Sequence, residues 1–106
     1  MQETEFLKLA ESALIELADL IEIKDEKSIF DVEYSDGILN IEVFDQNQIY
    51  VINKHSASQK IWFSSPLSGA EYFAYDAKSQ KWLDKNNREL KTVLISELTN
   101  NFNFKL

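Results

Sequence analysis

The stretch from residue 30 to residue 44, FDVEYSDGILNIEVF, decides the fold class of this chain. Apolar and acidic side chains alternate strictly from Phe30 to Tyr34, which is the period of a strand that buries one of its two faces. Asp36-Gly37 is typical of a two-residue hairpin turn. The strand that follows places Leu39, Ile41 and Val43 on one face. The stretch therefore predicts an antiparallel hairpin whose apolar face needs a covering layer.

Four more strands are predicted beyond this hairpin, at residues 48–53, 60–64, 71–76 and 80–83. Turn residues separate them at 45–47 and 77–79, and a Ser- and Pro-containing loop does so at 65–69. Strands that follow one another through short connections favour an antiparallel meander. We therefore expect a sheet of about six strands.

Amphipathic helices are predicted on both sides of the strands. The first spans about residues 4–23, with Thr4 as its N-cap and an apolar stripe on one face. The second spans about 88–100, with Asn86-Asn87 as its cap, and the tail 101–106 is expected to lie against the core. The order predicts an α+β fold: one domain over residues 1–106, in which two helices cover one face of an antiparallel sheet and the other face meets solvent.

The composition excludes several functional classes. There is no Cys and only one His, so neither a thiol nucleophile nor a His-rich metal site can form. With two Gly, the chain has no phosphate-binding glycine loop. A net charge of -7 argues against nucleic acid as a ligand. Because no apolar run approaches the ~20 residues of a membrane span and no signal peptide is recognisable, we expect a soluble, cytoplasmic protein.

The negative charge is concentrated in the first half of the chain. Residues 1–45 hold thirteen acidic residues against three lysines, a net charge of -10. Residues 46–106 hold eight basic residues against five acidic ones, a net charge of +3. In the predicted fold the end of the first helix lies near the first strand, which would join seven carboxylates into an acidic ridge. The residues of this acidic ridge are Glu16, Asp19, Glu22, Asp25, Glu26, Asp31 and Glu33.

A carboxylate surface of this kind allows three interpretations. Oxygen ligands suit hard cations such as Fe³⁺, Fe²⁺, Mn²⁺ or Ca²⁺, and without His or Cys the affinity would be modest and the site hydrated. Alternatively, the ridge is only a solvated face, an interpretation that the residues alone favour. It would also suit a basic partner.

One aromatic residue is predicted on the open face of the sheet. If Ile61 and Phe63 face the helices, Trp62 shares the solvent face with Lys60. An exposed Trp is typical of an interface. The alternative is a different register that places Trp62 in the core.

The whole chain resembles the frataxin family, and in particular its short bacterial members, known as CyaY. The resemblance rests on the acidic first helix with Glu5-Phe6-Leu7-Lys8-Leu9-Ala10, on the 30–39 hairpin, on Asn53-Lys54-His55 followed by Ile61-Trp62-Phe63, on the 69–76 strand and on Lys81-Trp82. In the pattern Asn-[Lys/Arg]-Gln-x-Pro-x-x-Gln-[Ile/Val]-Trp, this chain has His55, Ala57 and Lys60 in place of Gln, Pro and Gln.

The resemblance implies an iron-binding adaptor that regulates iron–sulfur cluster assembly and is not itself an enzyme. It implies weak, surface-exposed binding of iron (Fe²⁺ or Fe³⁺) on the acidic ridge. Its implied partners are the cysteine desulfurase, facing Asp19, Glu22, Asp31 and Glu33, and the scaffold protein. Asn53 and Trp62 would contact the scaffold, or the desulfurase near its mobile sulfur-carrying loop. We expect a monomer, with metal-induced oligomers as an alternative. The alternative functions are ferroxidase activity with iron storage, and a generic acidic interaction module.

The remaining candidates are weaker. His55 is interpreted as an ordinary loop imidazole, with a ligand or pH-sensitive contact as the alternative. Trp82 and the cluster Tyr72, Phe73 and Tyr75 are interpreted as core and sheet packing. A hydrolase triad is improbable, because only His55 could serve the serines as a base.

Overall fold

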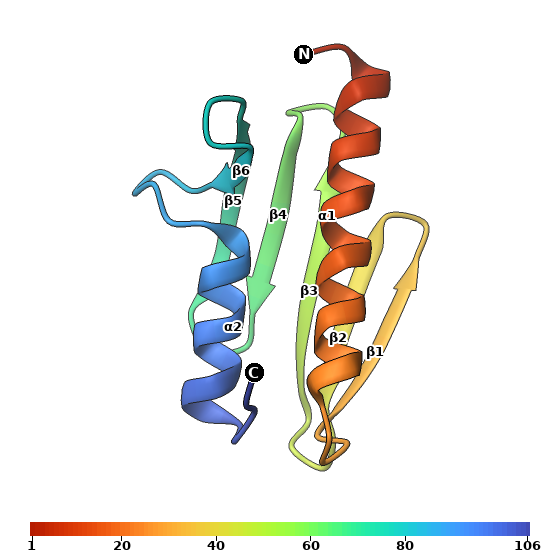
Figure 1. The fold of residues 1–106 in the computed structure, drawn as a ribbon, viewed down its shortest axis with the longest axis vertical. Coiled ribbons are helices and arrows are strands. Elements are labelled where there is room, and N and C mark those ends of the chain that lie inside the picture. The colour runs from red at the N-terminus through yellow and green to blue at the C-terminus, as the bar shows by residue number, and fades with distance from the viewer.

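The computed structural model describes residues 1–106 as two layers, with both helices on one face of a six-stranded antiparallel sheet (Figure 1). This confirms the predicted α+β class. In chain order the elements are α1 (Glu3–Lys24), β1 (Phe30–Ser35), β2 (Ile38–Val43), β3 (Gln48–His55), β4 (Lys60–Ser65), β5 (Gly69–Asp76), β6 (Lys81–Leu83) and α2 (Leu90–Asn101).

The sheet is a pure meander, because each strand pairs only with its neighbours in sequence, in the order β1-β2-β3-β4-β5-β6. The predicted turn between β1 and β2 is confirmed: Asp36 and Gly37 have φ angles of 51° and 77°, the positive values that a type I′ hairpin turn requires. This turn sets the register, in which Asp31 faces Glu42 and Glu33 faces Asn40.

The core lies between the helices and the inner face of the sheet. α1 packs on β1, β2 and β3, while α2 contacts β6. Ile61 and Phe63 of β4 are buried in this core, and Trp62 between them is half-buried on the opposite face, as predicted. In the tail, Phe102 and Phe104 are buried, and the Phe104 ring contacts that of Phe30 edge to face at 5.5 Å. Leu106 is exposed, so the prediction for the tail is right for its two aromatic rings only.

Both predicted helix starts are wrong. α1 begins at Glu3 with Gln2 as its N-cap, so Thr4 is already inside the helix. α2 begins at Leu90 with Glu89 as its N-cap, because Asn86 and Arg88 belong to a turn held by Asp84. The tertiary role of Asp84 is what a local capping pattern cannot reveal.

Neither helix combines the length and apolarity that crossing a membrane would require.

Candidate metal and partner-binding surface

The carboxylates of α1 point to two different sides of the helix. Glu16 lines a groove toward β6 and α2, together with Lys81 and Lys91. Glu22 shares the side of Glu11, since a separation of eleven positions makes about three helical turns, and Glu11 lies beside Tyr34 and Asp36 at the β1–β2 turn. The structure therefore keeps Glu22 near β1 and places Glu16 on the opposite flank.

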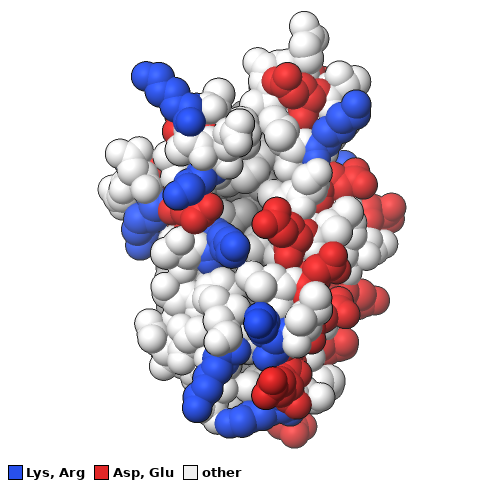
Figure 2. All heavy atoms as spheres, in the orientation of Figure 1, with Lys and Arg blue, Asp and Glu red and all other residues white.

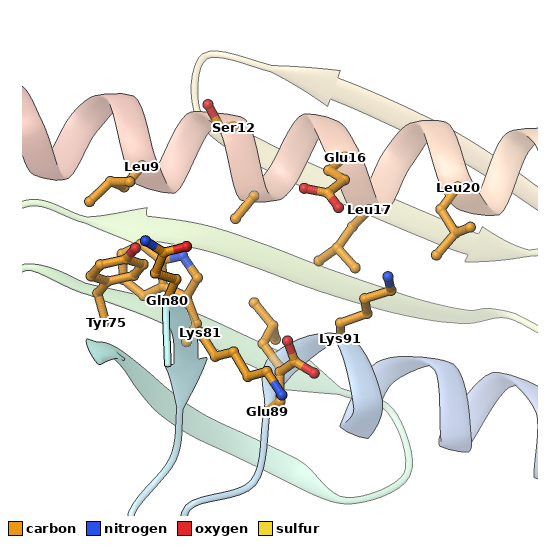
Figure 3. A pocket seen from close by; sticks show the side chains of 13 residues that line it. Leu9, Ser12, Glu16, Leu17, Leu20, Tyr75, Gln80, Lys81, Glu89 and Lys91 are labelled. Carbon is orange, nitrogen blue, oxygen red and sulfur yellow. The ribbon is translucent and has the colours of Figure 1, made fainter. Parts of the chain in front are cut away.

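Figure 3 shows this groove, whose volume is about 310 Å³. Leu17 and Leu20 of α1 lie along one wall, and Glu16 projects over the opening. Glu89, Lys81 and Lys91 come from the opposite side. No ion pair joins Glu16 to either lysine. Glu16 is thus a groove residue, and the predicted acidic ridge is narrower than the sequence indicated.

Strand β1 carries the next two carboxylates of the ridge. Asp31 and Glu33 are exposed on the outer face of the sheet, while Phe30 between α1 and the sheet is buried. The register places Glu42 of β2 directly opposite Asp31, and Glu42 is exposed as well. Glu42 was not predicted as part of the ridge. Residues at equal distances from a two-residue turn face each other, so the Asp36-Gly37 turn could have revealed the pair.

The connection between α1 and β1 gives Asp25 a structural role. Its two carboxylate oxygens accept hydrogen bonds from the backbone N–H groups of Ile29 and Phe30, each at 2.8 Å. These bonds tie the end of α1 to the start of β1. Glu26 is exposed and makes no side-chain hydrogen bond or ion pair. Of the two loop residues predicted for the ridge, Glu26 is therefore the one whose carboxylate is free.

Glu11 is a second residue that the sequence analysis left out of the ridge. Burial, and then the negative charges of Glu11 and Asp36, raise the pKa of the Tyr34 phenol. The two carboxylates and the phenol line the same cavity at the β1–β2 turn. Glu11 could have been predicted from helical spacing, because it lies on the same side of α1 as Glu22. The acidic surface thus extends along α1 toward its N-terminus.

The ridge carboxylates have no cationic partners. The structure contains two salt bridges, and both are made by Arg88 in the other half of the chain. Figure 2 shows acidic side chains gathered along the α1 and β1 side, with most Lys and Arg side chains toward β6, α2 and the lower end. An unpaired acidic surface of this kind attracts cations and basic proteins.

No three acidic or His side chains converge on one point that could hold a metal ion. The donor set consists of exposed carboxylates separated along a helix and a strand. Such donors fit a hard cation that keeps most of its water, with one or two carboxylates at a time. They do not form a closed cage. The residues are consistent with weak binding of Fe²⁺ or Fe³⁺ as cargo, not with a tightly held cofactor.

The outer face of the sheet holds the second predicted contact surface. Asn53, Trp62 and Tyr72 lie side by side on β3, β4 and β5, because Asn53 faces Trp62 and Trp62 faces Tyr72 in the register. Tyr72 is 47% exposed and packs on the sheet surface against the ring of His55, whereas Phe73 and Trp82 are buried, so the predicted sheet and core packing is confirmed for these three residues. An Asn and two aromatic rings in one row make a flat, adaptable contact surface.

His55 ends β3 and does not lie in a loop, contrary to the sequence interpretation. Its ring contacts that of Tyr72 edge to face at 5.9 Å, and its Nδ1 lies 2.8 Å from Ser58 Oγ. The ammonium group of Lys60 lies 6.0 Å from the centre of the same Tyr72 ring. His55 and Lys60 therefore border the aromatic row at its upper end.

Three comparisons place this geometry among known proteins. The family model for the frataxin-like domain matches residues 1–104. The mitochondrial frataxin of Dictyostelium discoideum is 40% identical over 84 residues, which is 76% of this chain and 43% of that protein. The mitochondrial frataxin homolog of Schizosaccharomyces pombe is 30% identical over 103 residues, which is 93% of this chain and 65% of that protein. The chain thus spans less than two thirds of each of these relatives.

Solved frataxin structures superpose on this fold. A frataxin of Psychromonas ingrahamii, described within the CyaY family, superposes with a TM-score of 0.78 at 24% identity, over 100% of this chain and 96% of that one, and this likeness shows the fold. The trimeric frataxin of Saccharomyces cerevisiae, solved as a complex with ferrous iron, superposes with a TM-score of 0.74 at 32% identity, over 87% of this chain and 83% of that one.

Proposed function

The chain belongs to the frataxin family, and from this premise we propose that it is an iron-binding adaptor that regulates iron–sulfur cluster assembly. In this proposal Asp19, Glu22, Asp31 and Glu33 dock on a basic surface of the cysteine desulfurase. Asn53 and Trp62 contact the scaffold protein on which clusters form. Iron is cargo or a modulator on the same carboxylates.

The observation that carries this proposal is the unpaired state of the acidic surface. Carboxylates that serve stability normally find cations or N–H donors, whereas those of α1 and β1 find neither, apart from Asp25. Asp19 repels Glu16 and Glu22, which each lie three positions from it along the helix, and Asp19 and Glu22 lie near the C-terminal end, where the helix dipole disfavours anions. A surface with this energetic cost is best explained by a ligand or partner of opposite charge.

Two finer points are part of the proposal. The yeast relative solved with ferrous iron supports iron as the cation. Action in the cytoplasm, as expected from the sequence, is the second point. We propose that the chain acts as a monomer and assembles further only with metal.

The test compares two double variants that change the net charge by the same amount on the same helix. Asp19→Lys with Glu22→Lys reverses the ridge, whereas Glu3→Lys with Glu5→Lys reverses the opposite end of α1. We expect the first pair to weaken binding to the cognate cysteine desulfurase by at least about tenfold, because close interfacial charge pairs are strongly coupled. The second pair should change it little. Calorimetric titration measures both, and equal losses in the two variants would reject the ridge as the docking surface.

Iron and scaffold binding are tested separately. Anaerobic addition of Fe²⁺ to the ¹⁵N-labelled protein should broaden amide signals around Glu22, Glu26 and Asp31 and leave those of α2 sharp. Trp62→Ala should weaken scaffold binding while leaving the iron response intact. Broadening spread evenly over the molecule would speak against a defined iron surface.

A further inference from the structure

Strand β5 has a free edge over more than half of its length. Residues 69–74 of this eight-residue strand pair with β4 on one side, but β6 pairs only with Ala74, Tyr75 and Asp76 on the other. No hydrogen bond from outside β4 reaches the backbone of residues 70–73. After Leu83 the chain turns away and pairs with Glu89 instead. Alternate N–H and C=O groups of residues 70–73 therefore point outward without a partner.

A cleft of about 740 Å³ runs beside this free edge. Ala70 and Tyr72 of β5 line one side, and Lys85, Asn86 and Val93 line the other. Tyr72 is about half exposed on the open face. The space lies next to the unpaired backbone groups, which is the arrangement needed for an added strand.

The charge available in this cleft is positive. Its three carboxylates are already bound within the protein: Glu71 by Arg88, Asp84 by Arg88 and two backbone N–H groups, and Glu97 by three hydroxyl groups. Lys60 and Lys85 line the same cleft and make no salt bridge. An incoming chain would therefore meet two free ammonium groups and no free carboxylate.

We propose that the free edge of β5 binds an extended, acidic peptide segment of a partner protein as an added strand. The backbone groups of residues 70–73 would supply the hydrogen bonds, and Lys60 and Lys85 would select acidic side chains. A second copy of this chain is disfavoured, because pairing two β5 edges would bring Lys60 and Lys85 of both copies together. The proposed site uses none of the ridge residues.

The probe is an eight-residue peptide, acetylated and amidated, that alternates threonine and glutamate. When this peptide is added to the ¹⁵N-labelled protein, we expect saturable shifts at residues 70–73 and slower hydrogen exchange of the amides that point outward. Lys60→Glu with Lys85→Glu should weaken binding about tenfold, because the rim charges then repel the peptide. The matched control is Lys27→Glu with Lys105→Glu, which changes the net charge equally outside the cleft and should bind as the wild type does.

Two further peptides separate strand pairing from simple charge attraction. They carry N-methyl groups on odd or on even residues, so that one of them cannot donate to the β5 edge. We expect one of the two to lose binding and the other to retain it. Equal binding by both, or shifts that leave residues 70–73 unchanged, would overturn the proposal. Concentration-dependent broadening of the same signals without peptide would also overturn it, in favour of pairing between copies.

Discussion

The two halves of this protein use carboxylates in opposite ways. In the C-terminal half, Asp84, Glu71 and Glu97 are each held by N–H or hydroxyl donors. In the N-terminal half, Asp19 and Glu22 of α1 and Asp31 and Glu33 of β1 are exposed and form no ion pair. The first group stabilises the fold. The second group destabilises the fold and remains available for binding. The charge of a carboxylate therefore does not by itself distinguish a stabilising role from a binding role.

The first group, Asp84, Glu71 and Glu97, includes two carboxyl groups whose pKa values are shifted. Burial opposes ionisation of Asp84, but N–H groups of Arg88 and Asn86 donate to its carboxylate at 2.8 Å and hold its pKa below the ordinary value. Burial, and then the nearby Asp84, raise the pKa of Glu71, although Arg88 acts in the other direction. Arg88 donates to both carboxylates, at 2.8 Å to Asp84 and 3.2 Å to Glu71. The three residues therefore work as one unit.

The largest predicted effect comes from breaking this unit. Asp84→Asn removes the charge that Arg88 and two backbone N–H groups share, and places an amide N–H₂ group near the Arg88 donor. We expect a loss of about 2 kcal/mol in the free energy of unfolding, since hydrogen bonds to charged groups are worth roughly 1.5–3 kcal/mol. Urea denaturation measures it. The ridge variant Asp31→Asn serves as the control and should change stability by less than about 0.5 kcal/mol. A similar loss in both variants would remove the distinction between the two groups.

Glu97 is expected to give the next largest effect. Its carboxylate accepts hydrogen bonds from Tyr50 at 3.0 Å, Ser65 at 2.5 Å and Ser68 at 2.7 Å, and so fastens the loop before β5 to α2. Glu97→Gln should cost about 1 kcal/mol in unfolding free energy, because one charged acceptor is replaced by a neutral one. Faster amide exchange at Leu67 and Ser68 should accompany the loss. Unchanged exchange there would mean that Glu97 does not hold the loop.

Tyr50, which donates a hydrogen bond to Glu97, makes the stability of the fold depend on pH. Burial, and then the charge and hydrogen bond of Glu97, raise the pKa of the Tyr50 phenol above its ordinary value of 10.0. Because the folded state favours the neutral phenol, the stabilisation is complete below pH 10 and is lost as the pH rises above 10. We expect the melting temperature of the wild type to fall more steeply than that of Tyr50→Phe between pH 9.5 and about pH 11. Parallel curves would contradict the assignment.

The smallest effect is expected on the ridge, and it has the opposite sign. Glu22→Gln removes a repulsion with Asp19 and an anion near the C-terminal end of α1, so it should stabilise the protein by about 0.3–0.5 kcal/mol. The gain should shrink in high salt, because salt screens exposed charges. Urea denaturation at low and high salt measures both values. A destabilised variant would indicate that the ridge serves the fold after all.

The sequence predicted the elements well and the site unevenly. Alternation and the Asp36-Gly37 turn are local features, and they suffice for the hairpin. For Trp62, alternation left two registers open, and the structure shows the one that places it on the outer face of the sheet. The side on which Glu16 lies depends on where α2 packs, and the start of α2 depends on Asp84, which lies six residues before Leu90. Both features depend on tertiary packing, which cannot be predicted from a single sequence.

The free edge of β5 also depends on tertiary structure and could not be predicted from the sequence. Its cause is the brevity of β6 and the pairing of Leu83 with Glu89, which a pattern of alternating residues does not reveal. Glu11 and Glu42, in contrast, could have been found from helical spacing and hairpin symmetry.

The meander order of the sheet also bears on how the chain reaches its native state. Every strand pair is a hairpin between sequence neighbours, so the sheet can assemble through short loop closures, which favour rapid folding. Docking of α1 on β1, β2 and β3 and of α2 beside β6 then completes the core. The carboxylates of α1 and those of β1 become neighbours only when the helix docks. We therefore expect the acidic surface to be a late product of folding, so that a nascent or partly folded chain would offer its partner no binding surface.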